Sequence, residues 1–194
     1  MTSLDRPDLR FRTSWEEAVA EFAAADDFMH GSGVWDFDAL DTSAEGAPAV
    51  IAHLLAQADP ATELAEDRVH CTYYWITDDG EFVGYLALRH SLTAWLLEEG
   101  GHIGYSVRPS RRREGHATRA LVLAVAAAAE YGIERALVTC DDDNDGSRAV
   151  IERAGGVYED TRNGKRRYWI DTGLAKDVSA AGRSPRTAGR AAPA

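Results

Sequence analysis

Cysteine is scarce in this sequence, which contains only Cys71 and Cys140. Such a pair gives neither a disulfide framework nor the repeated spacing of a metal site. Each lies in an apolar run typical of a β-strand, so we expect both to be buried as small apolar side chains. Long apolar runs are missing too, because the longest, residues 120–129, is well short of the roughly 20 residues that span a bilayer. Residues 1–12 are polar and lack a secretory segment, so we expect a soluble, cytoplasmic protein without a membrane partner.

Positive charge is also in deficit. The chain has 21 basic and 32 acidic residues and a formal net charge of −11, so most of its surface would repel a nucleic acid and attract a cation. We therefore expect no nucleic-acid partner. The length of 194 residues fits one domain, which we place at residues 1–178. Residues 179–194 contain mainly Ala, Ser, Pro, Gly and Arg without periodicity, and this composition predicts a disordered tail.

The hydrophobic pattern predicts both strands and helices. Ser14 is expected to cap a helix that ends near Phe28, and Pro48 is expected in the first turn of a second helix. The predicted strands are residues 9–12, 69–77, 81–88, 102–108, 135–140, 157–159 and 165–171, and the predicted helices are residues 14–28, 49–58, 117–131 and 144–154. This order predicts an α/β (α+β) fold, in which a central mixed sheet has helices on both faces.

An anion site is predicted where the strand that ends at Val107 turns into a helix. Three arginines, residues 111–113, precede a helix N-terminus near Gly115. The free N–H groups and the dipole of such a terminus attract anions. Gly115 and Ala117 are small enough for the backbone to approach a ligand closely. The arrangement fits a phosphate or pyrophosphate, and the alternative is a solvated arginine cluster before a helix.

The spacing Val107-x-Pro109-x-x-Arg112-x-x-Gly115-x-Ala117 resembles the acyl-CoA pyrophosphate loop of the GNAT N-acetyltransferase superfamily. The usual form in that family is R/Q-x-x-G-x-G/A after a strand that ends V-x-P. The surrounding order of strand, loop, long helix, strand and helix is similar as well, and the resemblance covers residues 9–171. It implies the GNAT fold with a splayed central sheet, and acetyl-CoA as the cosubstrate with no metal.

The resemblance also implies roles around the loop. The main chain near Val107 would pair with the pantetheine arm, and the N–H groups of residues 113–118 would hold the pyrophosphate. The next strand, residues 136–140, would splay away and admit the cofactor, and the N-x-x-[SA] motif that follows it in the family fits here. The implied cofactor-binding residues are Val107, Arg112, Arg113, Gly115, His116, Ala117, Thr118, Asn144 and Ser147.

The segment that begins at Asp141 also matches the calcium-loop pattern D-x-[DN]-x-[DN]-G-x5-E. An EF-hand requires a helix before its loop, whereas residues 135–140 predict a strand. The eighth loop position is normally apolar, whereas here it is Arg148. We therefore interpret the segment as a strand end followed by a helix that Asp143 or Asn144 caps, and we expect no metal.

Amine acetylation requires a base for the amine and a proton for the departing thiolate. The resemblance points to a carboxylate on or near the Val107 strand as the base. Glu99 is our preferred candidate, because it shares the strand parity of Ile103. His102 has the opposite parity unless a β-bulge re-aims it. For each candidate the alternative is a solvated carboxylate or a structural histidine, and the further candidates are His90, Asp141 and Asp142.

The general acid has several candidates. The family often uses a tyrosine seven residues after the asparagine, but that position is Ile151 here. The candidates that remain are Tyr105, Tyr158, Ser147 and solvent. Because the usual tyrosine is missing, a non-catalytic module that binds CoA stays open as an alternative function.

The acidic, glycine-rich segment 30–48 lies where the family varies its substrate lid. Carboxylates bind ammonium groups and aromatic rings stack on apolar faces. We therefore predict a small cationic amine as substrate, most specifically an aminoglycoside-type antibiotic that is modified for resistance. The alternatives are acetylation of a protein N-terminus or a metabolite amine, and an acidic surface loop without a role. The sequence is silent on oligomeric state, although homodimers are common among proteins similar to this family. The predicted substrate-binding residues are Trp35, Asp36, Asp38, Glu98 and Asp142.

Overall fold

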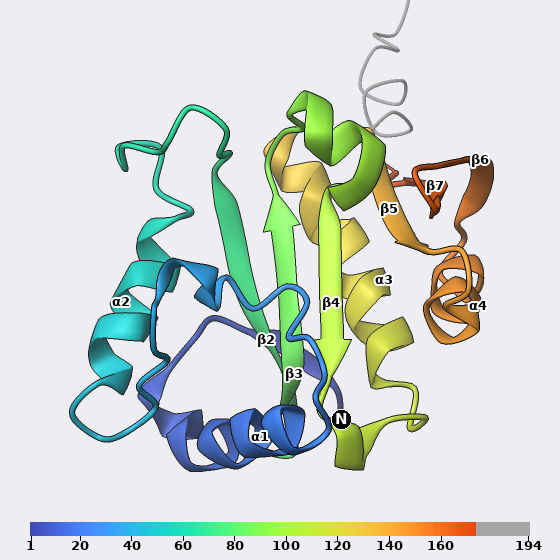
Figure 1. Cartoon of the computed structure of the whole chain (residues 1–194). Helices are drawn as coiled ribbons and strands as arrows, with labels where there is room; N and C mark the ends of the chain where they lie inside the picture. Colours follow the sequence, from blue (N-terminus) through green and yellow to red (C-terminus); the bar gives the residue numbers. More distant parts are fainter. Residues whose placement is uncertain (174–194) are drawn as a thin grey trace, which may run out of the picture.

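A single sheet of seven strands, in the order β1-β2-β3-β4-β5-β7-β6, forms the centre of the molecule (Figure 1). The computed structural model describes residues 1–173, so the tail predicted at residues 179–194 lies outside the described part. The strands are β1 (Ser3–Asp5), β2 (Cys71–Asp78), β3 (Glu81–Arg89), β4 (Ile103–Val107), β5 (Arg135–Asp141), β6 (Val157–Arg162) and β7 (Lys165–Asp171). The longer helices are α1 (Arg12–Ala24), α2 (Ala47–Ala56), α3 (His116–Ala128) and α4 (Asp145–Arg153).

One junction in the sheet differs from the others. Neighbouring strands pair in antiparallel fashion, except for β4 and β5, which run parallel and share only the register pair Ile103–Val138. Away from that pair the two strands diverge, as Figure 1 shows. The predicted mixed and splayed sheet is therefore confirmed.

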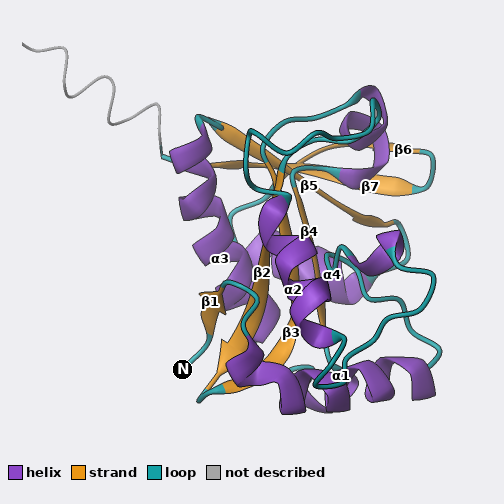
Figure 2. Cartoon of the chain, turned by 90° about the vertical axis from the view of Figure 1, so that its left-hand side faces the viewer, coloured by secondary structure: helices purple, strands orange, loops and turns teal. Residues whose placement is uncertain are grey.

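Each face of the sheet carries its own core. One core joins α1 and α2 to strands β2 and β3 and includes Trp15, Leu54 and Tyr85. The other joins α3 and α4 to the central strands and includes Leu86 and Ala120. Because successive residues of a strand point to opposite faces, Tyr85 and Leu86 place the two cores on opposite sides of the sheet (Figure 2). The prediction of helices on both faces is confirmed.

The start of the chain differs from the prediction. Residues 9–12 are predicted as a strand, but Leu9–Phe11 form one 3-10 turn that leads into α1. The Asp8 side chain accepts a hydrogen bond from the Arg10 N–H at 2.8 Å, and Phe11 is buried. The capped turn and the buried ring stabilise a helical start, so the first strand of the chain is β1 instead.

Helix α1 begins before its predicted cap. Ser14 lies inside the helix, where its hydroxyl donates to the Phe11 carbonyl at 3.0 Å and accepts from the Phe82 N–H at 2.9 Å. Ser14 therefore ties α1 to β3. The helix also ends earlier than predicted, at Ala24, because Asp26 adopts φ +50° and a right-handed helix cannot continue through that conformation.

Other local predictions are confirmed. Pro48 lies in the first turn of α2, and the Asn144 side chain caps α4 by accepting from the Ser147 N–H at 2.9 Å. Gly155 follows α4 with φ +94°, which glycine adopts at helix ends. Both cysteines are buried. No helix within residues 1–173 has the length and apolar character required to cross a membrane.

Candidate active site

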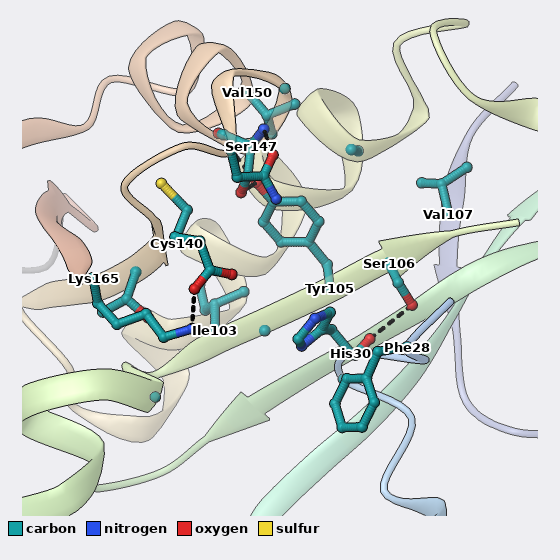
Figure 3. Close-up of a pocket in the computed structure, with 18 of the residues that line it drawn as sticks. Phe28, His30, Ile103, Tyr105, Ser106, Val107, Cys140, Ser147, Val150 and Lys165 are labelled. Atoms are coloured by element: carbon teal, nitrogen blue, oxygen red, sulfur yellow. Dashed lines mark hydrogen bonds and ion pairs between the residues drawn. The ribbon is translucent and has the colours of Figure 1, made fainter. Parts of the chain in front are cut away.

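A cleft of about 1410 Å³ opens where β4 and β5 diverge. Tyr105 and Ser106 of β4 both line it, although consecutive side chains of a strand point to opposite faces of the sheet. Figure 3 shows Tyr105 directed toward Ser147 on α4, and the Ser106 hydroxyl bonded to the His30 carbonyl. The cleft therefore passes through the sheet. We call its two ends the α3 end, lined by residues 111–113, 115–118, 144–147, 149, 150 and 153, and the α1 end, lined by residues 27, 28, 30, 31, 35, 67–69, 71, 73, 89, 95, 96, 99 and 100.

The α3 end is built from the first turn of α3 and the loop before it. Gly115 adopts φ +85°, and a Cβ at this position would lie 2.8 Å from a guanidinium nitrogen of Arg119, so the turn requires glycine. The N–H groups of the first helical turn have no acceptor within the helix and are free for an anion. The structure brings to the cleft all the residues predicted to bind the cofactor, namely Val107, Arg112, Arg113, Gly115, His116, Ala117, Thr118, Asn144 and Ser147.

Arg112 and His116 are among the side chains of this set that have partners within the protein. Arg112 donates to the Val107 carbonyl at 3.0 Å and to the Asp27 carboxylate at 2.5 Å. The His116 ring is 3% exposed and lies 2.9 Å from the Thr2 hydroxyl. Arg112 is therefore held against the strand and the loop after α1, and His116 offers the cleft its main-chain N–H more than its ring.

Tyr105 and Ser147 form a hydroxyl pair inside the cleft. The Tyr105 Oη and the Ser147 Oγ are 2.8 Å apart. Burial raises the pKa of Tyr105, so its hydroxyl is protonated at neutral pH and can donate a hydrogen bond. Cys140 of β5 lies beside the pair in Figure 3, and burial raises the pKa of its thiol. The cleft interior at this level is therefore lined by neutral donors.

Glu99 reaches the cleft from a single helical turn, Leu96–Gly100. The strand parity used in the sequence argument does not apply to it, because this segment is not extended. The Glu99 carboxylate accepts from the Asn163 side-chain amide at 3.3 Å, and its carbonyl accepts from the Thr139 hydroxyl at 2.5 Å. The result is a half-buried carboxylate on the cleft lining, next to β5.

His102 lies outside the cleft lining, between β4 and β5. The His102 main-chain N–H donates to the Leu137 carbonyl at 2.7 Å, and the Nδ1 of its ring accepts from the Leu137 N–H at 2.9 Å. Burial, with the charge of Arg89 as a second cause, lowers the pKa of His102 to about 4. The neutral ring thus joins the two diverging strands beside their one register pair. Its Nδ1 is occupied by the Leu137 N–H and is not available to a ligand in the cleft.

The carboxylates predicted for substrate binding are not gathered at the cleft. Of the five residues predicted to bind the substrate, only Trp35 lines the cleft. Its ring stacks on Phe28 with centroids 4.7 Å apart. Asp36 binds Arg68 at 2.7 Å. The remaining carboxylates face elsewhere, either in ion pairs with Arg162 and Arg166 or exposed; they are Glu98, Asp142 and Asp38.

The cleft also contains residues that the sequence did not single out. His30 lines the α1 end, and burial lowers the pKa of its ring, so the imidazole is neutral at pH 7 and able to accept a proton. Arg89, at the end of β3, lines the same end, and Arg153 of α4 lines the α3 end. A signal for His30 exists in the two glycines that follow it, Gly31 and Gly33, because both adopt positive φ and bend the loop back onto the sheet.

The segment that matches a calcium loop has the structure predicted for the alternative interpretation. Strand β5 extends to Asp141 and Asn144 caps α4, so a strand stands where an EF-hand requires a helix. The Asp141 carboxylate is in an ion pair with Lys165. Within residues 1–173 there is no group of three or more histidine, cysteine or carboxylate side chains that could hold a metal ion.

Comparison with known proteins agrees with this architecture. The family model of the acetyltransferase (GNAT) domain matches residues 6–157. No curated protein matches the sequence. Similar solved structures include the ribosomal L7/L12 α-N-protein acetyltransferase RimL in complex with coenzyme A, which is 20% identical with a TM-score of 0.59 over 89% of this chain and 95% of that one. RimJ of Mycobacterium smegmatis in complex with CoA-disulfide is 22% identical with a TM-score of 0.62 over 94% and 90% of the two chains.

A third similar structure is the microcin C7 self-immunity acetyltransferase MccE in complex with acetyl-CoA and AMP. It is 16% identical, with a TM-score of 0.59 over 88% of this chain and 92% of that one. At these identities the likeness supports the fold, while the family model covers most of the chain. The chain therefore belongs to the GNAT acetyltransferase family and is an acetyl-CoA-dependent acetyltransferase.

Proposed function

We propose that the protein transfers the acetyl group of acetyl-CoA to a primary amine that enters from the α1 end of the cleft. The observation that carries this proposal is the passage through the sheet. It places an anion-binding helix terminus on one face and a carboxylate with aromatic side chains on the other. Two reactants that enter from opposite faces meet between β4 and β5, where the hydroxyl pair lies.

The α3 end fits the cofactor. Its N–H groups, the exposed Arg113 and Arg153 and the close backbone approach at Gly115 suit a diphosphate and a phosphate ester. RimL, RimJ and MccE have been solved with CoA, CoA-disulfide and acetyl-CoA respectively, which supports the same ligand here. The cofactor supplies the activated thioester; the chain supplies orientation and proton transfer.

The proton transfers are assigned as follows. Glu99 accepts a proton from the substrate ammonium, and the neutral amine attacks the thioester carbonyl carbon. The C–S bond then breaks, Tyr105 gives its proton to the departing thiolate, and the second proton lost by the attacking nitrogen returns to the hydroxyl pair through Ser147. Because the pKa of Tyr105 is raised by burial, the tyrosine holds its proton until the thiolate forms. The 2.8 Å contact with Ser147 then allows Tyr105 to regain a proton from the Ser147 hydroxyl.

The α1 end of the cleft fits an aminoglycoside substrate less well than the sequence predicts. The carboxylates expected to bind its ammonium groups are in ion pairs or lie away from the cleft, whereas the α1 end presents aromatic rings, Phe28, Trp35 and Trp95. RimL, whose structure is similar to this one, is named as an acetyltransferase that acts on a protein α-amine. We therefore propose a primary amine on a small molecule or peptide with an apolar body.

The test is thiol release from acetyl-CoA across aminoglycosides, polyamines, amino acids and short peptides, with the mass of each product. We expect a gain of one acetyl group on one class, and loss of most turnover in Glu99→Gln with acetyl-CoA binding retained. Tight acetyl-CoA binding without thiol release for any amine would instead establish a non-catalytic CoA-binding module. Turnover confined to aminoglycosides would restore the sharper substrate prediction.

A further inference from the structure

Arg89 is a half-buried cation on the lining of the α1 end. It is the last residue of β3, and one guanidinium nitrogen, Nη1, donates to the carbonyls of Gly100 and Gly101 at 2.9 and 3.0 Å. These two bonds fix the plane of the guanidinium. Gly104 of β4, which pairs with Ala87, has no side chain to cover the guanidinium, since a Cβ there would lie 3.6 Å from Nη2 and 3.7 Å from Nη1. The free edge of the group is therefore open toward the cleft.

Among the described cations of the α1 end, Arg89 is the one that lacks an anionic partner. Four other cations of the cleft form ion pairs with carboxylates of the chain; these are Arg68, Arg111, Arg112 and Lys165. Arg113 and Arg153 have no such pair within residues 1–173, but they lie at the α3 end, where the cofactor phosphates supply the negative charge. Arg89 lies at the α1 end, and no carboxylate of the described chain is within ion-pair distance of it. A half-buried charge without a counter-charge is unfavourable, so this position favours an anion from the ligand.

The surroundings indicate what accompanies that anion. Three aromatic side chains at the mouth of the α1 end remain exposed, namely Phe28 at 54%, Trp35 at 44% and Trp95 at 59%. Exposed aromatic groups that converge on one cleft are typical of a binding site for an apolar or flat ligand. A fixed guanidinium recognises a carboxylate through two parallel hydrogen bonds.

We propose that the acceptor carries a carboxylate that Arg89 binds, together with an apolar or aromatic body that packs on Phe28, Trp35 and Trp95. This assigns the acceptor to the class of amino acids and short peptides with a free carboxylate, and it makes Arg89 a specificity-determining residue. The inference rests on the proposed amine acetylation and narrows its substrate. It also explains why a polycation, which Arg89 would repel, fits this end poorly.

The test compares free acids with their amides, which have the same shape and lack the charge. The pairs are phenylalanine with phenylalaninamide, and Ala-Phe with Ala-Phe amide. We expect the wild-type protein to acetylate the acid with a kcat/KM about tenfold or more above that of the amide. In Arg89→Gln this ratio should fall to about one, because kcat/KM falls for the acid and not for the amide. Arg89→Lys should retain part of the ratio, because the positive charge remains although the paired hydrogen bonds of the guanidinium are lost.

Arg68→Gln is the matched control, since Arg68 lines the same end but already pairs with Asp36; we expect it to leave the acid-to-amide ratio unchanged. Acetyl-CoA affinity, measured by calorimetry, shows whether each variant is folded. Turnover of the amides at least as fast as of the acids would overturn this inference and leave amine acetylation standing. So would turnover of aminoglycosides or polyamines alone.

A second measurement separates the two proposals if no amine reacts. Binding of N-acetylphenylalanine and of its amide is measured by calorimetry on wild type and on Arg89→Gln, without turnover. Preferential binding of the acid that Arg89→Gln abolishes would support the carboxylate site even though the proposed activity had failed. Equal binding of acid and amide to the wild-type protein would overturn the site as well.

Discussion

The two ends of the cleft are built by different means. The α3 end uses main-chain N–H groups, small residues and a helix terminus, all of which come from the continuous segment 107–118 with a contribution from α4. The α1 end uses side chains from separate segments, among them the loop after α1, the end of β3 and the turn Leu96–Gly100. An end built from the main chain tolerates little change in shape, whereas an end built from separate side chains can change its ligand by single substitutions. The predictions below test this contrast.

The largest expected effect is at the base on the α1 end. Glu99→Gln removes the proton acceptor but keeps the size of the side chain, so kcat should fall by about a thousandfold while the affinity for acetyl-CoA stays the same. Steady-state kinetics and calorimetry measure the two quantities. Glu98→Gln is the matched control, since Glu98 pairs with Arg162 and lies outside the lining. Equal effects of the two variants would contradict the assignment of Glu99.

The next effect concerns the junction between the two ends. The pKa of His102 is lowered to about 4 by burial, so the unfolded chain binds a proton at higher pH than the folded one does. The stabilisation is complete above pH 6.5, the usual histidine value, and is lost as the pH falls toward 4. Across that window the free energy of unfolding should fall by up to about 3 kcal/mol.

Urea unfolding at pH 7 and at pH 4.5 measures this loss. Other groups titrate in the same range, so the quantity that isolates His102 is the difference between wild type and His102→Gln. The variant should be less stable at pH 7, because the Leu137 N–H loses the imidazole acceptor. Its stability should depend less on pH, because the titrating ring has been removed. A variant with an unchanged pH slope would show that the ring does not carry the effect.

A smaller effect is expected at the α3 end. Gly115→Val places a branched side chain at φ +85° and 2.8 Å from the guanidinium of Arg119, so the turn before α3 is strained and the Arg119 side chain must move. Acetyl-CoA affinity should fall by about thirtyfold, which corresponds to about 2 kcal/mol. Gly132→Val is the control, because Gly132 has φ +74° with nothing within 4 Å of its Cβ position. Gly132→Val should lower the stability of the protein without weakening acetyl-CoA binding. A loss of acetyl-CoA affinity in both variants would point to general backbone strain.

The smallest effect tests the link between the ends. Asp27 belongs to the α1 end and binds Arg112 of the α3 end at 2.5 Å, with side chains that are 35% and 43% exposed. If Arg112 binds the pyrophosphate, Asp27 competes for it. Asp27→Asn should then tighten acetyl-CoA binding by up to about fivefold at low salt and by less at high salt. Weaker binding in the variant would mean that Asp27 positions Arg112 for the cofactor.

The sequence predicts the α3 end far better than the α1 end. The strand, the arginine loop, Gly115 and the helix start are adjacent in the chain, so their spacing alone indicates the site. Arg89 carries no such signal, because only the pairing of β3 with β4 brings it to the cleft. The acidic lid fails for the same reason: Asp36 is in an ion pair with Arg68, a residue 32 positions away, and no local pattern reveals that contact.

The same limit explains why the strand-parity argument for Glu99 does not hold. Alternation predicts side-chain direction only within an extended strand, and the turn Leu96–Gly100 interrupts the strand before β4. Its start is held by the Thr93 hydroxyl, which accepts from the Leu96 N–H at 3.2 Å. Glu99 nonetheless reaches the cleft lining, by a route that its sequence position did not indicate.

The divergence of β4 and β5 has a further consequence for the sheet itself. The Arg89 N–H bonds the His102 carbonyl at 2.8 Å and the Arg108 N–H bonds the Val83 carbonyl at 2.9 Å, so the even-numbered residues of β4 face β3. The main-chain groups of Tyr105 and Val107 therefore face the gap. An open sheet normally has edges only at its outermost strands, here β1 and β6, but this one has an additional edge inside the molecule.

Sheet edges accept other extended chains, which is why exposed edges are a hazard. Here the walls of the cleft limit access to the inner edge, and an extended molecule with amide groups, such as the pantetheine arm, has the donors and acceptors to pair with it. The cofactor then acts as a missing strand. Because such a ligand binds the folded chain and not the unfolded one, we expect saturation with acetyl-CoA to raise the melting temperature.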